Sequence, residues 1–236
     1  MTSISPSHGD RAVAPSASRS AGYKALLRPL LFVFVAAALA LAFALLGSEV
    51  GEGETRTFDL QMLQLAQALR AAYPGLAEVM RDLSGLGSTV VLTLFTLATV
   101  GYLLLVSKKT TALLVAASAL SGTVLVSVFK ALFGRLRPDA AYAALTASGL
   151  SFPSGHASMS ALVFLTLGTV IASSRSRLSE RAYILLTAIL MTLLVGLSRI
   201  LLGVHYATDV FGGWAFGSAW AMAWLVLARH LGRSQD

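Results

Sequence analysis

The sequence predicts an all-α, polytopic membrane protein with six transmembrane helices. Hydrophobic residues make up 56% of the 236 residues, charged residues only 12%, and the mean hydropathy is +0.75. Soluble domains usually contain about 25% charged residues. Six uncharged stretches of 17 to 25 residues each lie between two charged residues or between a histidine and a charged residue. A transmembrane helix needs about 20 apolar residues. Cysteine is absent, which excludes disulfides, thiolate metal sites and a cysteine nucleophile.

The six apolar stretches divide the chain into a membrane domain and two tails. Their bounding residues are Arg28 and Glu49, Asp82 and Lys108, Lys109 and Lys130, His156 and Arg175, Arg181 and Arg199, and Asp209 and Arg229. We expect a disordered cytoplasmic tail over residues 1–24, which are rich in Ser, Ala and Pro. The membrane domain covers 25–229 and a short cytoplasmic tail covers 230–236. The first stretch resembles a signal peptide at Ala38–Ala40, but its long apolar core favours an uncleaved anchor.

The connection between the first two spans, residues 48–85, is too long for a simple loop. Phe58, Met62, Leu65 and Leu69 recur at i, i+4, i+7 and i+11, with polar residues between them. This spacing predicts an amphipathic helix, and a proline–glycine pair after it leaves room for a second short helix. Such an interfacial helical loop either caps the bundle or lies at the membrane surface where a lipid enters. The two roles are compatible.

The distribution of basic residues predicts the orientation in the membrane. If the N-terminus is cytoplasmic, 11 of the 18 Lys and Arg residues lie on the cytoplasmic side, which they favour. The 48–85 connection then lies outside, with three Arg against six acidic residues. The net charge of +7 therefore reflects orientation, and no nucleic-acid partner is expected. Four cations fall outside against this trend: Lys130, Arg135, Arg137 and Arg199.

Ionisable residues at the ends of transmembrane helices are costly unless they are paired or functional. The first such group, Lys130, Arg135 and Arg137, ends the third span. Three cations so close together repel one another, and an anion among them would relieve this repulsion. Arginine suits phosphate oxygens and lysine acts as a point charge. The alternative is that these long side chains reach lipid headgroups.

A second polar group, Ser154, Gly155 and His156, opens the fourth span. Ser154 suits an N-cap position, and glycine lets the backbone approach a ligand closely. The free N–H groups at a helix start form an anion site, and His156 would lie beside the bound anion. The alternative is a capped helix whose histidine only faces the membrane interface.

The third polar group connects the fifth and sixth spans. His205 and Asp209 are spaced i, i+4, so on a helix they would share a face. A carboxylate that bonds one imidazole nitrogen fixes the tautomer and raises the basicity of the other nitrogen. That second nitrogen can then attack an electrophile. The alternative is a plain surface pair.

The predicted topology returns all three groups to the same membrane face. A cationic pocket with two histidines and an orienting carboxylate suits phosphoryl transfer through a phosphohistidine. A histidine nucleophile divides hydrolysis into two easier steps, cations offset the charge on the transferring group, and the second histidine can act as acid and base. The converging residues are Lys130, Arg137, Ser154, His156, Arg199, His205 and Asp209.

At these residues the sequence resembles the type 2 phosphatidic acid phosphatase superfamily, which has a three-part signature. This chain carries Lys130-x6-Arg137-Pro138, Pro153-Ser154-Gly155-His156 and Ser198-Arg199-x5-His205-x3-Asp209. The resemblance covers roughly residues 85–228 and implies a six-helix membrane core with metal-independent phosphatase activity and no cofactor. Arg135 and Asp139 lie outside the signature, so it assigns them no role. Ala207 stands where many members have proline.

Taken residue by residue, the resemblance implies a role for each position of the signature. His205 would be the nucleophile, Asp209 its orienting partner and His156 the general acid. The phosphate would be held by Lys130, Arg137, Ser154, Gly155 and Arg199.

The signature recognises phosphate and not the rest of the substrate, so several substrates stay open. The family includes soluble vanadate-dependent haloperoxidases, which the six spans argue against, and enzymes of soluble sugar phosphates. Among lipids, undecaprenyl pyrophosphate is slightly favoured, and phosphatidylglycerol phosphate, phosphatidic acid and the lipid A 1-phosphate are alternatives. A different class, an anion transporter, would also use buried cations, but would place them near mid-membrane. A lipid-binding protein without catalytic activity is a third class.

The function and the charge distribution together predict a location. We expect a multi-pass protein of the cell membrane, in a bacterium the inner membrane, with both termini in the cytoplasm. The active site would lie at the extracytoplasmic face and act on a membrane lipid phosphate. The bilayer and this substrate are the expected partners.

Overall fold

The computed structural model describes residues 17–232, and the regular elements within that range are all helices. Among these residues, six segments are long and apolar enough to cross a membrane, which confirms the predicted fold class. The second of them combines α3 and α4, which a short turn separates. The elements are α1 (Ala17–Glu52), α2 (Arg56–Ala72), α3 (Leu76–Gly85), α4 (Thr89–Leu105), α5 (Lys109–Phe133), the 3-10 helix η1 (Ala140–Tyr142), α6 (Gly155–Ser173), α7 (Leu178–Leu201) and α8 (Ala207–Gly232).

The tails differ from the sequence-based expectation where the structure describes them. Residues 1–16 of the tail expected over 1–24 lie outside the described residues, but α1 already begins at Ala17. Residues 24–28, which are Lys, Ala, Leu, Leu and Arg, have good helix propensity, and extending an existing helix requires no new nucleation. At the other end α8 continues to Gly232, and the last four residues lie outside the described part of the chain.

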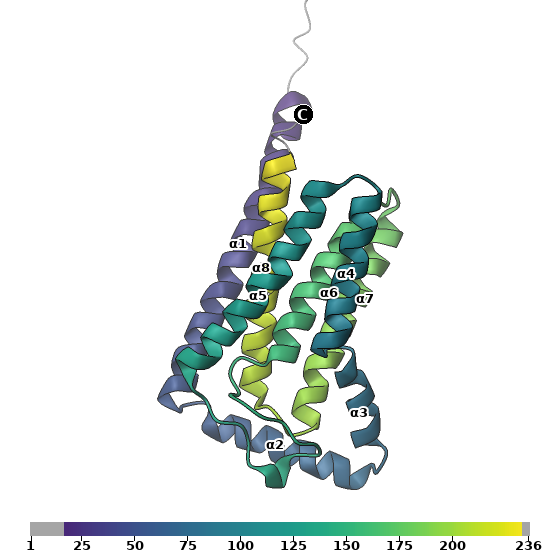
Figure 1. Ribbon diagram of the computed structural model, residues 1–236. Coiled ribbons are helices and arrows are strands. Elements are labelled where there is room, and N and C mark those ends of the chain that lie inside the picture. Colours follow the sequence, from purple (N-terminus) through teal and green to yellow (C-terminus); the bar gives the residue numbers. More distant parts are fainter. Residues whose placement is uncertain (1–16, 233–236) are drawn as a thin grey trace, which may run out of the picture.

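Helix α6 lies at the centre of the bundle. It packs against α7 and α8 and also contacts α4 and α5, and a larger share of its side chains is buried than in any other span. Helix α1 packs along α8, and the start of α1 and the end of α8 lie at the same end of the bundle (Figure 1). Helix α2 lies across the opposite end (Figure 1).

Two glycines of α8 bring its backbone against the start of α6. A Cβ atom at Gly213 would lie 2.9 Å from the carbonyl oxygen of Ser154, and one at Gly217 would lie 2.2 Å from that of Ser158. Small residues spaced four apart allow this close approach between membrane helices. The amide N–H of Ser154 also donates to the carbonyl oxygen of Asp209 over 2.9 Å. The polar starts of α6 and α8 are therefore held next to each other.

Helix α2 confirms the predicted amphipathic helix, but its buried face differs from the predicted one. Asp59, Leu63 and Ala66 are buried, whereas Phe58 and Leu65 are exposed. The buried face is thus displaced by one residue, because the helix turns a carboxylate inward. Hydropathy could not anticipate this, since burial of a charge is favourable only when a partner is present. The short helix α3 follows, as expected.

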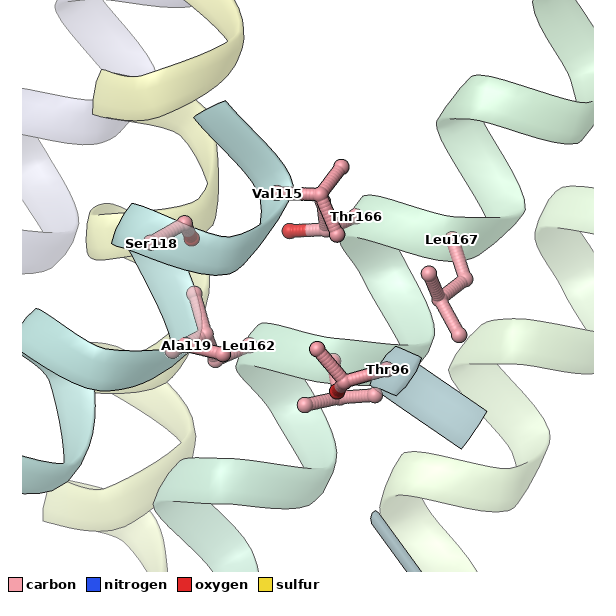
Figure 2. Close-up of a pocket in the computed structure, with 8 residues that line it drawn as sticks. Thr96, Val115, Ser118, Ala119, Leu162, Thr166 and Leu167 are labelled. Carbon is pink, nitrogen blue, oxygen red and sulfur yellow. The ribbon is translucent and has the colours of Figure 1, made fainter. Parts of the chain in front are cut away.

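A small cavity lies midway along the bundle between α4, α5 and α6 (Figure 2). Thr96, Ser118 and Thr166 contribute hydroxyl groups to its lining. Those of Ser118 and Thr166 have no hydrogen-bond partner among the residues that the structure describes. The space of about 10 Å³ suits a single ordered water that would satisfy these groups.

Replacing Gly217 with alanine should destabilise the contact between α6 and α8. The new Cβ would meet backbone that cannot rotate away, so the helices must separate, and such overpacking costs about 1–3 kcal/mol. Thermal unfolding of the purified protein should show a lower transition temperature. Gly101→Ala on α4 is the matched control, because a Cβ atom there would have no neighbour within 4 Å apart from its own stretch of helix, and it should cause no loss. Equal transition temperatures for the two variants would contradict the tight contact.

Candidate active site

The three polar groups of the sequence meet at the end of the bundle that α2 covers. Each comes from the end of a helix or from a turn beside it, where a polar side chain can leave the apolar layer. Lys130 lies near the end of α5, Arg137 follows α5, Ser154, Gly155 and His156 lie at the start of α6, Arg199 is near the end of α7, His205 precedes α8, and Asp209 lies in its first turn.

His205 and Asp209 form a buried pair, although not through a shared helical face. His205 Nδ1 lies 3.3 Å from Asp209 Oδ2, and both residues are almost fully buried. His205 precedes α8, and Asp209 is the third residue of that helix. The carboxylate also accepts a hydrogen bond from the amide N–H of Tyr206 over 2.9 Å. Asp209 thus caps the start of α8, and this cap brings the carboxylate to the imidazole.

Further donors hold the Asp209 carboxylate in place. The hydroxyl of Ser151 donates to Oδ2 and lies 3.3 Å from His205 Nδ1. Arg135 Nη1 donates to Oδ1 over 2.7 Å. Both carboxylate oxygens are therefore used, and hydrogen bonds of this kind favour the ionised form. A fixed, ionised carboxylate orients the neighbouring imidazole ring.

The surroundings of His205 define its proton position. Arg137 Nη1 lies 3.1 Å from His205 Nε2, and a guanidinium group can only donate. Nε2 is therefore the acceptor, and the ring proton lies on Nδ1, facing Asp209. Burial lowers the pKa of His205 to about 4, although the hydrogen bond and charge of Asp209 act in the opposite direction. The ring is neutral at pH 7, with the lone pair of Nε2 directed toward the cations.

Lys130 and Arg137 fix the loop that leads into α6. Lys130 Nζ donates to the carbonyl oxygen of Leu150 over 2.6 Å. Arg137 Nε donates to the carbonyl oxygens of Ser148 and Gly149 over 3.0 and 3.1 Å. These bonds to neutral carbonyl groups orient both cations without neutralising their charge.

Arg199 is the most deeply buried of the three cations, with 6% of its surface exposed. Its Nη1 donates to the hydroxyl of Ser84 on α3 over 2.6 Å, and its Nε has no partner among the described residues. Within the described part of the chain, Lys130, Arg137 and Arg199 form no ion pair with a carboxylate. Because unpaired buried charge is costly, the pocket is suited to an anion.

The start of α6 completes this anion-binding arrangement. The Ser154 hydroxyl accepts a hydrogen bond from the amide N–H of Ala157 over 3.5 Å, which confirms it as the N-cap. Gly155 and His156 line the same cavity as Lys130. The positive end of the helix dipole therefore adds to the charge of the side chains.

An apolar cavity of about 360 Å³ extends from this pocket between α4, α5 and α6. Lys130 and His156 line its polar end. The remaining lining is formed mainly by aliphatic and small hydroxyl side chains, among them Leu92, Leu97, Val100, Leu120 and Met159. A cavity of this kind accepts a molecule with one anionic end and an apolar remainder.

The two residues without a role in the signature have different surroundings. Arg135 forms ion pairs with Asp59 at 2.6 Å and with Asp209 at 2.7 Å. Burial alone would lower the pKa of Arg135, but the two carboxylates outweigh it and raise the pKa. Asp139 is exposed and caps η1, since its Oδ1 accepts from the amide N–H of Ala141 over 2.8 Å. Arg135 therefore belongs to the site, and Asp139 to the loop.

Several polar residues around the site were not found by sequence reasoning. Motif spacing does not single out Ser151, and Asp59 is only one of six acidic residues in the 48–85 connection. The one available signal was the placement of Asp59 within an amphipathic pattern beside Phe58. The residues that the structure adds are Asp59, Ser84, Ser151 and Thr208.

Comparisons with known proteins agree with this geometry. Residues 111–233 match the sequence model of the PAP2 superfamily. Phosphatidylglycerophosphatase B of Bacillus subtilis (strain 168) is 31% identical over 182 residues, which are 76% of this chain and 87% of that protein. Decaprenylphosphoryl-5-phosphoribose phosphatase of Mycobacterium tuberculosis (strain ATCC 25618 / H37Rv) is 31% identical over 163 residues, or 68% of this chain and 85% of that protein.

Two crystal structures share the fold. A transmembrane PAP2-type phosphatidylglycerolphosphate phosphatase from Bacillus subtilis matches with a TM-score of 0.76 and 26% identity, covering 86% of this chain and 98% of that chain. Aquifex aeolicus LpxE matches with a TM-score of 0.51 and 25% identity, covering 71% and 94%. The family match spans more than half of the chain, and the resemblance seen in the sequence is confirmed. This chain is a membrane-spanning member of the PAP2 superfamily of phosphatases.

Proposed function

We propose that this chain removes a phosphate group from a membrane lipid through a covalent phosphohistidine at His205. The observation that carries the proposal is the surroundings of His205 Nε2. A neutral, oriented imidazole lies 3.1 Å from Arg137. Neither the half-buried Lys130 and Arg137 nor the buried Arg199 has a carboxylate partner among the described residues. The relatives whose names describe phosphatases of phosphatidylglycerol phosphate and of a decaprenylphosphoryl sugar support a lipid substrate.

In the first step Nε2 of His205 attacks phosphorus. The N–P bond forms as the bond to the leaving oxygen breaks, and His156 donates a proton to that oxygen. Nδ1 keeps its proton, and the positive charge that develops on the ring is stabilised by the Asp209 carboxylate 3.3 Å away. Lys130, Arg137, Arg199, the hydroxyl of Ser154 and the amide N–H of Gly155 offset the charge of the phosphoryl oxygens.

In the second step water hydrolyses the phosphohistidine. His156, now neutral, accepts a proton from the water as it attacks phosphorus. The N–P bond breaks, inorganic phosphate leaves, and His205 returns to its neutral form with the proton on Nδ1. The cations supply the charge stabilisation that a metal ion provides in other phosphatases. Both Asp209 oxygens are occupied by protein donors, so we expect the reaction to require no metal.

The two histidines should respond differently to substitution. His205→Gln removes the nucleophile and should abolish both turnover and covalent labelling by radioactive phosphate. His156→Gln should slow turnover by about 10²–10⁴-fold, the usual contribution of a general acid. Its loss should be smaller for an aryl phosphate, whose leaving oxygen needs little protonation. Steady-state kinetics on both substrates check this, and an equal loss on the two would argue that His156 is not the acid.

The apolar cavity supports a lipid rather than a water-soluble substrate. It runs from Lys130 and His156 toward the membrane-facing helices α4 and α5, where a hydrocarbon chain can remain out of water. The polar groups lie at one end of the bundle, whereas an anion transporter would place them near mid-membrane. The lipid itself is either undecaprenyl pyrophosphate, slightly favoured from the sequence, or a phosphate monoester, which the names of the relatives favour.

A substrate panel should separate these possibilities. Purified protein is assayed on undecaprenyl pyrophosphate, phosphatidylglycerol phosphate, phosphatidic acid, lipid A and glucose 6-phosphate, each with and without excess EDTA. We expect the lipids to be hydrolysed well before the sugar phosphate, and EDTA to have no effect. A preference for glucose 6-phosphate would overturn the lipid assignment. Loss of activity in EDTA, restored by Mg²⁺ or Zn²⁺, would overturn the metal-free mechanism.

The orientation proposed from the charge distribution places the active site outside the cytoplasm. The cysteine-free chain allows single cysteines to report sidedness in intact cells. Ser151 is unsuitable because it is fully buried, whereas Ser148 beside the site and Ser176 in the loop between α6 and α7 are exposed. A cysteine at Ser148 should react with a membrane-impermeant thiol reagent, and one at Ser176 should not. The reverse pattern would place the site in the cytoplasm.

A further inference from the structure

Asp59 on α2 is a fully buried carboxylate that takes no part in the phosphoryl transfer. Its exposed fraction is 0%. Oδ1 accepts from the amide N–H of Thr208 over 3.1 Å. Oδ2 accepts from the hydroxyls of Thr208 and Thr55 and from Arg135 Nη2, over 2.7, 3.1 and 2.6 Å. A buried charge persists only with such a set of partners, so this position is built for a carboxylate.

Arg135 is shared between Asp59 and the carboxylate of the active site. Its Nη2 bonds Asp59, and its Nη1 bonds Asp209 Oδ1 over 2.7 Å and the Thr208 hydroxyl over 2.8 Å. The guanidinium lies over the ring of Tyr206, 4.1 Å from its centroid. A planar guanidinium has donors in a rigid fork, so fixing one edge of the group on Asp59 fixes the other edge on Asp209.

The other end of α2 is held to the same region. Arg70 donates to the carbonyl oxygen of Leu201, at the end of α7, and to that of Tyr142 over 2.6 Å. Leu201 lies just before the turn that carries His205, and Tyr142 lies in the loop after Arg137. Both ends of α2 are thus bonded to segments that carry active-site residues, which restricts the movement of Asp59.

We propose that Asp59 is a positioning residue for the phosphatase reaction. Through Arg135 it holds Asp209, and therefore the attacking Nε2 of His205, in the orientation required for attack on phosphorus. The proposal rests on the proposed function of the same site. It gives the connection between the first two spans a mechanistic role, because a misplacement of about 1 Å at reacting groups can reduce a rate by about 10²-fold.

A purely structural role for Asp59 would give a different result. In that case its loss would destabilise the protein, and the molecules that remained folded would turn over normally. A positioning role instead lowers kcat in folded protein while substrate binding is retained. Stability and kinetics must therefore be measured on the same purified variants.

Asp59→Asn is the informative substitution, because asparagine has the same shape and can still accept from Thr208. It removes the negative charge that holds Arg135. On dioctanoyl phosphatidic acid we expect kcat to fall by about 10²-fold with KM little changed, in protein that thermal unfolding shows to be folded. Glu54→Gln, an exposed carboxylate in the same connection, is the matched control and should retain wild-type kcat. A wild-type kcat for Asp59→Asn would overturn the proposal.

A double-mutant cycle tests whether Asp59 acts through Arg135. Arg135→Gln alone should also reduce kcat. Adding Asp59→Asn to it should reduce kcat no further, because the connection is already broken and no cation remains for Asp59 to hold. Losses that multiply in the double variant would show that Asp59 acts independently of Arg135 and would contradict the proposal.

A spectroscopic measurement does not depend on turnover. In protein labelled with ¹⁵N-histidine, the Nδ1–H signal of His205 is identified by its loss in His205→Gln. This signal should shift in Asp59→Asn and in Arg135→Gln, and stay in place in Glu54→Gln. An unshifted signal in Asp59→Asn would overturn the positioning role of Asp59, whatever the activity of the wild-type protein. A wild-type protein that hydrolyses no lipid phosphate would instead count against the proposed function.

Discussion

Arg135 forms ion pairs with both Asp59 and Asp209. The position of the Asp209 carboxylate, and with it the geometry of the site, depends on these two ion pairs. Two buried carboxylates this close to one cation compensate for their desolvation only because nearly every polar atom is also hydrogen-bonded. The Asp209 carboxylate is held by Arg135 and Ser151, and its other side-chain contact is with the imidazole of His205. Because Arg135 already compensates the negative charge of Asp209, that charge does not neutralise the cations of the anion pocket.

The pocket stays cationic because Asp209 is paired with Arg135 and not with a cation of the pocket. The hydrogen bonds of Lys130, Arg137 and Arg199 go to neutral groups: backbone carbonyls, Nε2 of His205 and the Ser84 hydroxyl. Neutral acceptors orient a cation without cancelling its field. An anionic group that enters the pocket therefore meets uncompensated charge in a region of low dielectric, where electrostatic interactions are strongest. The same field disfavours protonation of His205, which keeps the lone pair of Nε2 available.

The packing of the helices brings the starts of α6 and α8 together at the site. The glycines of α8 allow the starts of α6 and α8 to touch, so the amide N–H of Ser154, the N-cap of α6, donates to the backbone carbonyl oxygen of Asp209 in the first turn of α8. The connection between the first two spans covers the same end of the bundle. From there Asp59 bonds Arg135 and Ser84 bonds Arg199. The charged residues of the site are confined to one end of the bundle, and the middle of each span carries only uncharged side chains.

The sequence by itself determined the membrane class, the six spans, the helical connection and the residues of the three motifs. These features depend on local composition and spacing, which the chain carries directly. Only the tertiary structure decided that His205 precedes α8, that Asp209 caps it, and that Arg135, Asp59, Ser84 and Ser151 belong to the site. Their contacts join residues as far apart as Asp59 and Thr208. Whether a buried polar side chain is paired depends on partners that the fold brings together, and neither hydropathy nor spacing contains that information.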